Sequence, residues 1–361
     1  MPPAKSATDV ISPAFERVKR QMLTPFRMAT WSRLALIAVL TGEVGGGGWS
    51  SVANSNLTSG GQPGNKLASP PFPWMEEGMK YLPYLLVGLV ALVCLGIVML
   101  YVQSVFRFVL FDAVLRTRYG IREGWRRWKE AGSSFFLWQL TLGLLSLAVT
   151  AVILGLPAYW VWRTKLYEHA EENIGLLIGV GLIVFAIWIG VFLAGALVEL
   201  GARDFVVPVM AMERVRVMEG WRRVLPMLGA EKGKFVFYVV MKIVLSIGVG
   251  ILLGFAAAAV FIAALIPLGI VGAAVFVAAA AGGLGWNAYT IAATGVAGML
   301  VVLGLFYLMG FAYAPGMVFF QAYALEFLGA RYARLGAELA PPAPPRAPPT
   351  AGGALPSPAA P

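Results

Sequence analysis

The sequence has little of what soluble catalytic proteins depend on, namely cysteine, histidine and charge. Cys94 is the single cysteine and lies inside an apolar run, which excludes a disulfide framework or a cysteine-based metal site within one chain. His169 is the single histidine, which excludes multi-histidine zinc and iron sites but leaves carboxylate-only binding of magnesium or calcium open. Charged residues make up 13% of the 361-residue chain, about half the ~25% of soluble proteins, so an ordinary soluble enzyme is excluded.

Long apolar runs take the place of these residues. Hydrophobic residues make up 59% of the chain and the mean hydropathy is +0.77. Several runs exceed the ~18 apolar residues that a membrane-spanning helix needs, so we expect an all-α, polytopic membrane protein without cofactors. About six transmembrane helices are predicted, the first being a short uncleaved anchor; the runs are 31–44, 82–106, 134–162, 174–199, 235–266 and 290–313. The apolar stretch 267–284 is either a seventh crossing or a half-helix that enters and leaves one leaflet.

Composition divides the chain into three parts. Residues 1–30 form a basic, amphipathic N-terminal segment that we expect on the cytoplasmic side. Residues 31–325 form the transmembrane domain, with an outer loop rich in glycine and serine at 45–80. Residues 326–361 form a cytoplasmic end with a proline-rich tail, whose composition cannot bury a core and predicts disorder.

Basic residues predict the orientation, because Lys and Arg in short loops are retained in the cytoplasm. Arginines and lysines crowd the connections 107–129 and 203–234, whereas the connection 163–173 is acidic. We therefore expect a cytoplasmic N-terminus and two basic connections that face inward. The excess of Arg over Lys and the abundance of Ala, Gly and Pro are typical of a high-GC bacterial genome, so the expected location is the bacterial inner membrane.

A pentapeptide recurs within these two basic connections. Glu-Gly-Trp-Arg-Arg occupies 123–127 and again 219–223, 96 residues later, which predicts repeats that start at about 110 and 206. Glutamate and arginine four residues apart can pair on one helix face. Tryptophan prefers the headgroup layer and arginine reaches lipid phosphates, so one hypothesis is a lipid-headgroup interface made of Trp125, Arg126, Arg127, Trp221, Arg222 and Arg223. The alternative is that these residues are topology determinants and interfacial anchors.

Three ionisable residues are candidates for a polar site within the membrane, where an isolated charge costs several kcal/mol. Lys242 lies about two turns into the fifth run, and Glu199 at the end of the fourth run is a candidate partner. Glu43 lies where the first run meets four glycines. Each residue has a structural alternative, since Lys242 can snorkel or pair and Glu43 can sit at an outer helix end. Asp112 and Arg116, four residues apart, are expected to form a surface ion pair.

The Gly-Trp-Arg-Arg stretch is followed, after about ten residues, by an apolar helix that starts with aromatic residues. In this it resembles the repeated element in the membrane domain found beside some bacterial glycerophosphodiester phosphodiesterases. The start at 27–31 and the tetraglycine end at 43–48 resemble a related family of bacterial multipass proteins of unknown function. The resemblance covers roughly 10–335 and implies a fold and a compartment. It implies no phosphodiesterase activity, because the catalytic domain is missing from this chain.

No catalytic motif stands out, because the chain has neither a phosphate-binding loop nor a Gly-x-Ser-x-Gly elbow. The expectation is therefore a non-enzymatic membrane protein that acts as a scaffold or engages membrane lipids, anionic phospholipid among them. Membrane-protein partners are also expected, and nucleic acid is not. The alternative is a transporter of a small or amphiphilic solute, for which repeats and Lys242 are the supporting features.

Overall fold

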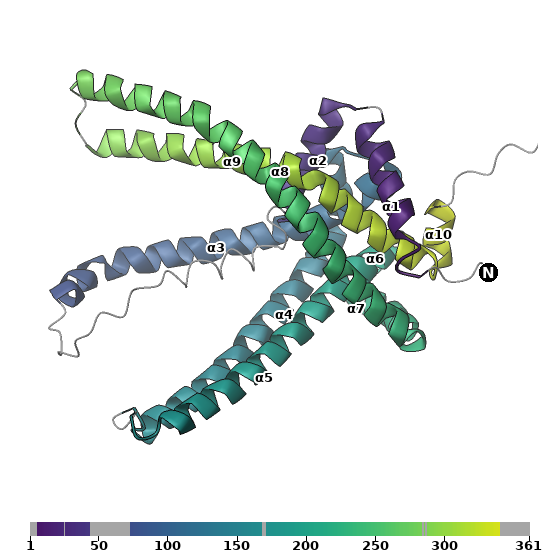
Figure 1. Cartoon of the computed structure of the whole chain (residues 1–361), viewed down its shortest axis with the longest axis horizontal. Coiled ribbons are helices and arrows are strands. Elements are labelled where there is room, and N and C mark those ends of the chain that lie inside the picture. Colours follow the sequence, from purple (N-terminus) through teal and green to yellow (C-terminus); the bar gives the residue numbers. More distant parts are fainter. Residues whose placement is uncertain are drawn as a thin grey trace, which may run out of the picture.

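The computed structural model describes residues 6–24, 26–43, 73–167, 171–283, 285 and 287–339, and these residues contain helices and turns but no strand (Figure 1). Two short segments, η1 and η2, are π-helical. In chain order the elements are α1 (Ile11–Val18), η1 (Lys19–Leu23), α2 (Met28–Leu40), α3 (Pro73–Arg116), α4 (Ile121–Arg163), α5 (Ile174–Gly201), η2 (Ala202–Val206), α6 (Val207–Glu213), α7 (Val217–Ala230), α8 (Lys232–Ala281), α9 (Ala288–Gly329) and α10 (Ala333–Leu339).

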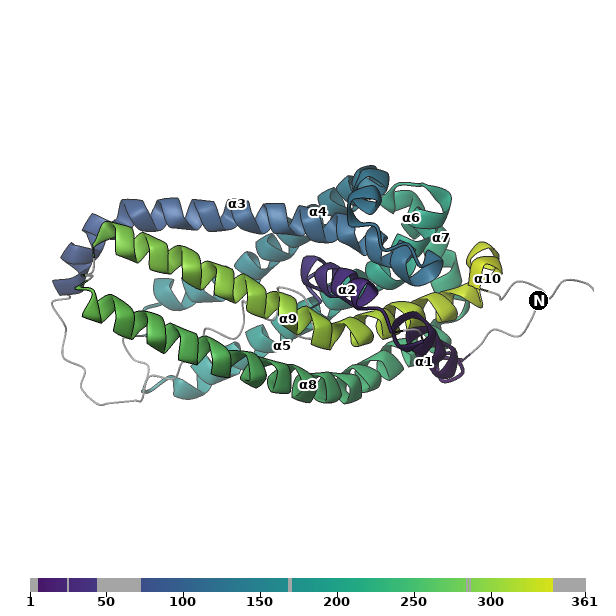
Figure 2. The same cartoon turned by 90° about the horizontal axis from the view of Figure 1, so that it is seen from above.

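The molecule consists of a packed base and three apolar arms. We define the base as α1, η1, α2, η2, α6, α7 and α10 with the adjoining ends of α3, α4, α8 and α9, which together hold the hydrophobic core. The arms are the remainder of α3, the hairpin α4–α5 and the hairpin α8–α9, and they diverge as they leave the base (Figure 1). Both α1 and α10 lie in the base, while the turns of the two hairpins lie at the opposite end (Figure 2).

Five helical runs are long and apolar enough to cross a membrane, as the sequence predicts. The most apolar window of four of them is 0% buried within the protein, and that of α8 is 6% buried. Apolar helices with so little protein around them are those of a multipass membrane protein, in which lipid covers the surface that protein does not. The five runs are Leu86–Arg116, Ile121–Arg163, Ile174–Glu213, Lys232–Ala281 and Tyr289–Gly329.

The first apolar run does not form a spanning helix of its own. It folds as the 13-residue helix α2, about 20 Å long, whereas the hydrocarbon core of a bilayer is about 30 Å thick. Leu34, Ala35, Ile37 and Ala38 are fully buried, because α2 packs against α9 and α3. The prediction of six crossings counted this run as the first of them, and among the described residues five helices are long enough to cross. Residues 44–72 and the tail from 340 lie outside the described residues.

The stretch 267–284 is neither a separate crossing nor a half-helix, as far as its described residues 267–283 go. It continues α8 through Pro267 as far as Ala281. A helix of 50 residues is about 75 Å long, and it runs obliquely across the base and along its arm (Figure 1). Tilt is the usual way in which a long apolar helix fits a bilayer. Hydropathy does not predict this continuous helix, because it measures how long an apolar stretch is and not whether the helix axis turns within it.

Small residues set the closest helix crossings in the base. A Cβ atom added to Gly132 of α4 would lie 2.6 Å from Val105 Cγ2 of α3, and one at Gly124 would lie 3.0 Å from the Val109 methyls. At Gly220 of α7 a Cβ atom would lie 2.8 Å from Val206 Cγ1. The glycine in both copies of the pentapeptide thus permits a close approach between helices.

Helix α3 begins at Pro73, inside the segment that the sequence predicts as an outer loop.

Candidate functional site, a charged cavity at the foot of the arms

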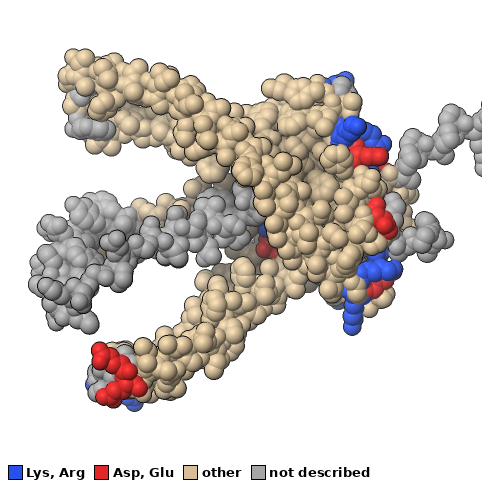
Figure 3. All heavy atoms as spheres, viewed as in Figure 1, with Lys and Arg blue, Asp and Glu red and all other residues tan. Residues whose placement is uncertain are grey.

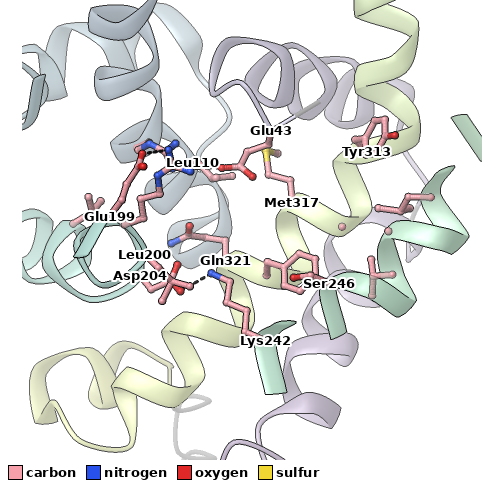
Figure 4. Close-up of a pocket in the computed structure, with 18 of the residues that line it drawn as sticks. Glu43, Leu110, Glu199, Leu200, Asp204, Lys242, Ser246, Tyr313, Met317 and Gln321 are labelled. Carbon is pink, nitrogen blue, oxygen red and sulfur yellow. Dashed lines mark hydrogen bonds and ion pairs between the residues drawn. The ribbon is translucent and has the colours of Figure 1, made fainter. Parts of the chain in front are cut away.

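A cavity of about 340 Å³ opens where α3, α5 with η2, α8 and α9 meet the end of α2. It contains all three of the polar residues predicted within the membrane, since Glu43, Glu199 and Lys242 line it together (Figure 4). Three further charged side chains line the same cavity, and they are Arg107, Arg203 and Asp204. The formal charges of these three acidic and three basic groups sum to zero.

The π-helical segment η2 supplies two of these side chains. Its five residues include Arg203 and Asp204, and the run from α5 into α6 continues through it without a break. A π-turn adds one residue to an α-helix and re-aims the side chains beside it, which is why such turns are frequent at functional sites. Here the turn lies at the cavity wall.

Among the acidic residues that line the cavity, Asp204 accepts hydrogen bonds from two side chains. Its Oδ2 accepts hydrogen bonds from Tyr238 Oη at 2.8 Å and from Lys242 Nζ at 2.5 Å. The Asp204 side chain is 9% exposed and that of Lys242 is 18% exposed. Tyr238 is fully buried and stacks on Tyr323, with ring centroids 5.1 Å apart. This pair therefore joins η2 to α8 within a largely buried setting.

The other two acids pair with arginines. Arg107 Nη1 lies 3.4 Å from Glu43 Oε1, which ties α3 to the end of α2. Glu199 pairs with Arg203 one turn further along the same helical run. The predicted partnership of Lys242 with Glu199 is therefore wrong, because Lys242 pairs with Asp204 instead. The π-turn explains the difference, since a regular α-helical register does not describe the residues after Gly201.

Three hydrogen-bond donors at the cavity lack an acceptor. Arg107 Nε, Arg203 Nε and Gln321 Nε2 are buried and have no partner among the described residues. Gln321 points from α9 into the space between Asp204 and Glu199 (Figure 4). A buried donor without a partner costs about 1–3 kcal/mol. The cavity is thus suited to a ligand that brings acceptor oxygens, such as a phosphate or a carboxylate.

The residues of the repeated pentapeptide lie elsewhere and contact other parts of the base. The ring centroid of Trp125 lies 5.6 Å from that of Tyr101, and that of Trp221 lies 6.1 Å from that of Trp138, so both indoles pack between helices. Arg126 and Arg222 are exposed.

The second arginine of each copy forms ion pairs, as the spacing predicts. Arg127 Nη2 lies 2.6 Å from Glu123 Oε1. Arg223 Nε lies 3.3 Å from Glu219 Oε1, and Arg223 also pairs with Glu213. Headgroup recognition by the two copies stays a prediction, and the structure does not bring their six residues together.

Sequence analysis missed Asp204, Arg107 and Arg203 as site residues. One signal was available, because Arg107 and Arg203 are 96 residues apart, the spacing of the repeated pentapeptide. Asp204 carried a weaker signal as an acidic residue at the head of the apolar run 205–212.

Asp112 is another residue whose setting differs from the prediction. Its ion pair with Arg116 exists at 3.1 Å, but the carboxylate is buried and does not lie on the surface. It also accepts hydrogen bonds at 3.0 Å from Arg127 Nη1 and Trp128 Nε1.

Within the described residues no cluster of three or more His, Cys, Asp or Glu side chains is arranged to hold a metal ion.

Fold and site together define a multipass membrane protein with a charged cavity at the foot of its apolar arms. The chain belongs to DUF7544, a family of unknown function, which matches residues 5–337. No curated protein matches the chain, and no solved structure does. The family agrees with the expected uncharacterised membrane protein, while the likeness to the phosphodiesterase-associated domain stays a prediction.

Proposed function

We propose that this protein binds a phospholipid-like amphiphile without catalysing a reaction on it, holding the polar headgroup in the charged cavity. The observation that carries the proposal is the set of three buried, unpartnered donors, Arg107 Nε, Arg203 Nε and Gln321 Nε2, at one cavity. Arginine is well suited to phosphate oxygens, because its planar fork donates two parallel hydrogen bonds. The balanced charge of the cavity favours a headgroup that carries charges of both signs.

The remaining walls of the cavity suit the apolar part of such a ligand. Ala196, Val249 and Leu253 line it from α5 and α8. Beyond them the arms carry exposed aliphatic and aromatic side chains, and the face shown in Figure 3 is free of charge along most of the α4–α5 and α8–α9 hairpins. Charged atoms show in the notch where the arms meet the base (Figure 3). A headgroup in this notch leaves its acyl chains alongside apolar helices, as in the bilayer itself.

The proposed setting is the bacterial inner membrane, with the base on the cytoplasmic side. The support is the distribution of charge, because Lys and Arg gather at the base end of the molecule (Figure 3). The turn between α4 and α5, at the other end, carries Glu171 and Glu172. This asymmetry is the one that retains basic segments in the cytoplasm. We also propose anionic phospholipid and membrane proteins as partners, at surfaces other than the charge-balanced cavity.

Gln321→Leu tests the headgroup site without breaking an ion pair. Removing one donor to a phosphate should weaken binding by about 1–2 kcal/mol, or about tenfold, while the fold is retained. Full-length protein in detergent is titrated with dihexanoyl phosphatidylethanolamine and dihexanoyl phosphatidylglycerol, and binding is followed by native mass spectrometry. Thr164→Val, at the far end of the α4–α5 arm, is the control and should bind like the unaltered chain. Equal affinity for both variants would refute the proposed site.

The second candidate function is transport of a small or amphiphilic solute. The Lys242–Asp204 pair favours it, because a buried ion pair at a cavity wall can exchange a partner for a charged solute. Asp204→Asn keeps the hydrogen bond to Tyr238 and removes the charge. Flux of solute or lipid is measured in proteoliposomes. If the unaltered chain supports flux and the folded Asp204→Asn variant does not, the function is transport and not binding alone. If neither chain supports flux above empty liposomes, the binding function stands.

A further inference from the structure

A second cavity, of about 770 Å³, lies in the base and is strongly basic. Arg17, Arg20, Arg27 and Arg33 line it from α1, η1 and the start of α2. Thr117 and Tyr119 line it from the turn between α3 and α4. No acidic residue is part of its lining, in contrast to the balanced cavity at the foot of the arms. We call it the basic cleft.

The wall of the basic cleft is held in place by two hydrogen bonds. Gln21 Nε2 donates to Val114 O at 2.6 Å, which fixes η1 against α3. Trp31 Nε1 donates to Met22 O at 2.8 Å, which closes the turn between η1 and α2. Met22 is itself buried in the core. The arginines on both sides of this turn therefore project from a fixed backbone.

Three of the four arginines are not neutralised within the described residues. Arg17 Nη2 pairs with Glu326 Oε1 at 2.9 Å, and its Nε is buried without a hydrogen-bond partner. Arg20, Arg27 and Arg33 are exposed, and within the part of the chain that the structure describes no ion pair involves them. Three cations around one cleft repel one another, and a bound anion removes that repulsion.

Apolar side chains on the same turn indicate where the anion comes from. Leu23, Phe26 and Met28 are each more than half exposed, and they lie in sequence between Arg20 and Arg33 of the cleft. Exposed aromatic and aliphatic residues next to arginines are typical of segments that enter the headgroup layer. The anion in reach of such a segment is the phosphate of a lipid.

We propose that the basic cleft binds the phosphomonoester headgroup of an anionic lipid, with Arg20, Arg27 and Arg33 as the ligands of the phosphate. Arginine holds phosphate oxygens through paired hydrogen bonds, and a phosphomonoester carries more negative charge than a phosphodiester. The Tyr119 hydroxyl at the cleft offers a further hydrogen bond, whereas Thr117 Oγ1 already donates to Arg116 O at 2.7 Å. This site is separate from the headgroup cavity and does not depend on the function proposed for it.

Burial raises the pKa of the Tyr119 phenol, which therefore stays protonated and able to donate over the physiological range. This supports the role of Tyr119 as a donor beside the phosphate.

The test compares two triple variants of the full-length chain that lose the same charge. Arg20→Gln with Arg27→Gln and Arg33→Gln removes the proposed ligands. Arg122→Gln with Lys129→Gln and Arg163→Gln removes three exposed basic residues of α4 that line neither cavity and belong to neither copy of the pentapeptide. The detergent-purified proteins are titrated with dihexanoyl phosphatidic acid, dihexanoyl phosphatidylcholine, glycerol 3-phosphate and inorganic phosphate by microscale thermophoresis. Thermal unfolding midpoints check that both variants are folded.

Each arginine beside an anionic lipid contributes about a fivefold factor, so the cleft variant should lose affinity for phosphatidic acid by between tenfold and about a hundredfold. The α4 variant should stay within about twofold, and phosphatidylcholine should bind weakly to all chains. If glycerol 3-phosphate binds as tightly as phosphatidic acid, the phosphate comes from a soluble compound and the lipid assignment is wrong. Equal losses in both triple variants would show unspecific attraction and overturn the site.

Discussion

The base and the arms differ in whether protein covers their apolar side chains. In the base, aromatic and aliphatic side chains are fully buried, among them Phe108, Phe111, Phe135 and Tyr238. In the arms the apolar windows are exposed almost throughout. The base therefore depends on protein packing and ion pairs, whereas the arms depend on the lipid around them. Substitutions of the same kind should consequently have large effects in the base and small ones in the arms.

The largest effect is expected at Asp112, which receives hydrogen bonds from Arg116, Arg127 and Trp128. Asp112→Ala leaves these donors without a shared acceptor and should destabilise the protein by about 3–5 kcal/mol. Leu154→Ala, on the exposed face of the α4 arm, is the comparison and should change the stability by less than about 1 kcal/mol. Unfolding of both variants is followed by circular dichroism in detergent. Similar losses at the two positions would contradict the division into base and arms.

A smaller effect is expected from one added methyl group on α4. At Gly132 the new Cβ atom would lie 2.8 Å from the backbone Cα of Val105, so Gly132→Ala should cost about 1–3 kcal/mol. At Gly143, in the arm of the same helix, a Cβ atom meets nothing within 4 Å. Gly143→Ala should therefore be neutral or stabilise by up to about 1 kcal/mol, because alanine favours the helix. Thermal unfolding midpoints compare the pair, and a destabilised Gly143→Ala would show that the arms pack more tightly than the structure indicates.

The smallest effect concerns the pH dependence of stability through Glu231, which directly precedes α8 in the base. Hydrogen bonds from Lys234 and then Arg331 lower the pKa of Glu231 from its ordinary value of 4.5. Since the folded-state pKa is the lower one, the carboxylate contributes stability that is fully present above pH 4.5 and is lost as the pH falls through the folded-state pKa. The contribution of such a partly exposed group is at most about 1 kcal/mol.

Glu231→Gln should therefore unfold with less dependence on pH in the acid range than the unaltered chain. Thermal midpoints between about pH 7 and pH 3 measure this dependence. Glu171→Gln, at the tip of the α4–α5 arm, is the matched control and should keep the original pH profile. An unchanged profile for Glu231→Gln would show that the ion pairs with Lys234 and Arg331 add nothing to stability.

Much of the fold follows from the sequence, because apolar length alone decides that a helix can cross a membrane. The long runs at 82–106, 134–162 and 174–199 all lie within the observed helices. The failures come from information that hydropathy does not contain. Helix α2 is as apolar as a span, but its residues are buried against α9, more than 270 positions away in the chain.

The candidate site shows the same limit. Lys242, Glu199 and Glu43 are recognisable as charged residues at membrane depth, and they do line one cavity. The partners of Lys242 and Glu43 are not recognisable, because they lie on other elements, and Asp204, the partner of Lys242, belongs to the π-helical segment η2. A π-turn leaves no trace in hydrophobic periodicity.

The packing of α1 and α2 against α9 has a consequence for the order in which the protein matures. Translation makes the first two helices early but makes their binding surface, α9, only near the end of the chain, so four long helices are synthesised before α1 and α2 can pack. Contacts this distant in sequence form late and slowly. A nascent chain stalled before α9 therefore lacks the surface that covers α1 and α2, which leaves these two helices accessible to proteases and chaperones.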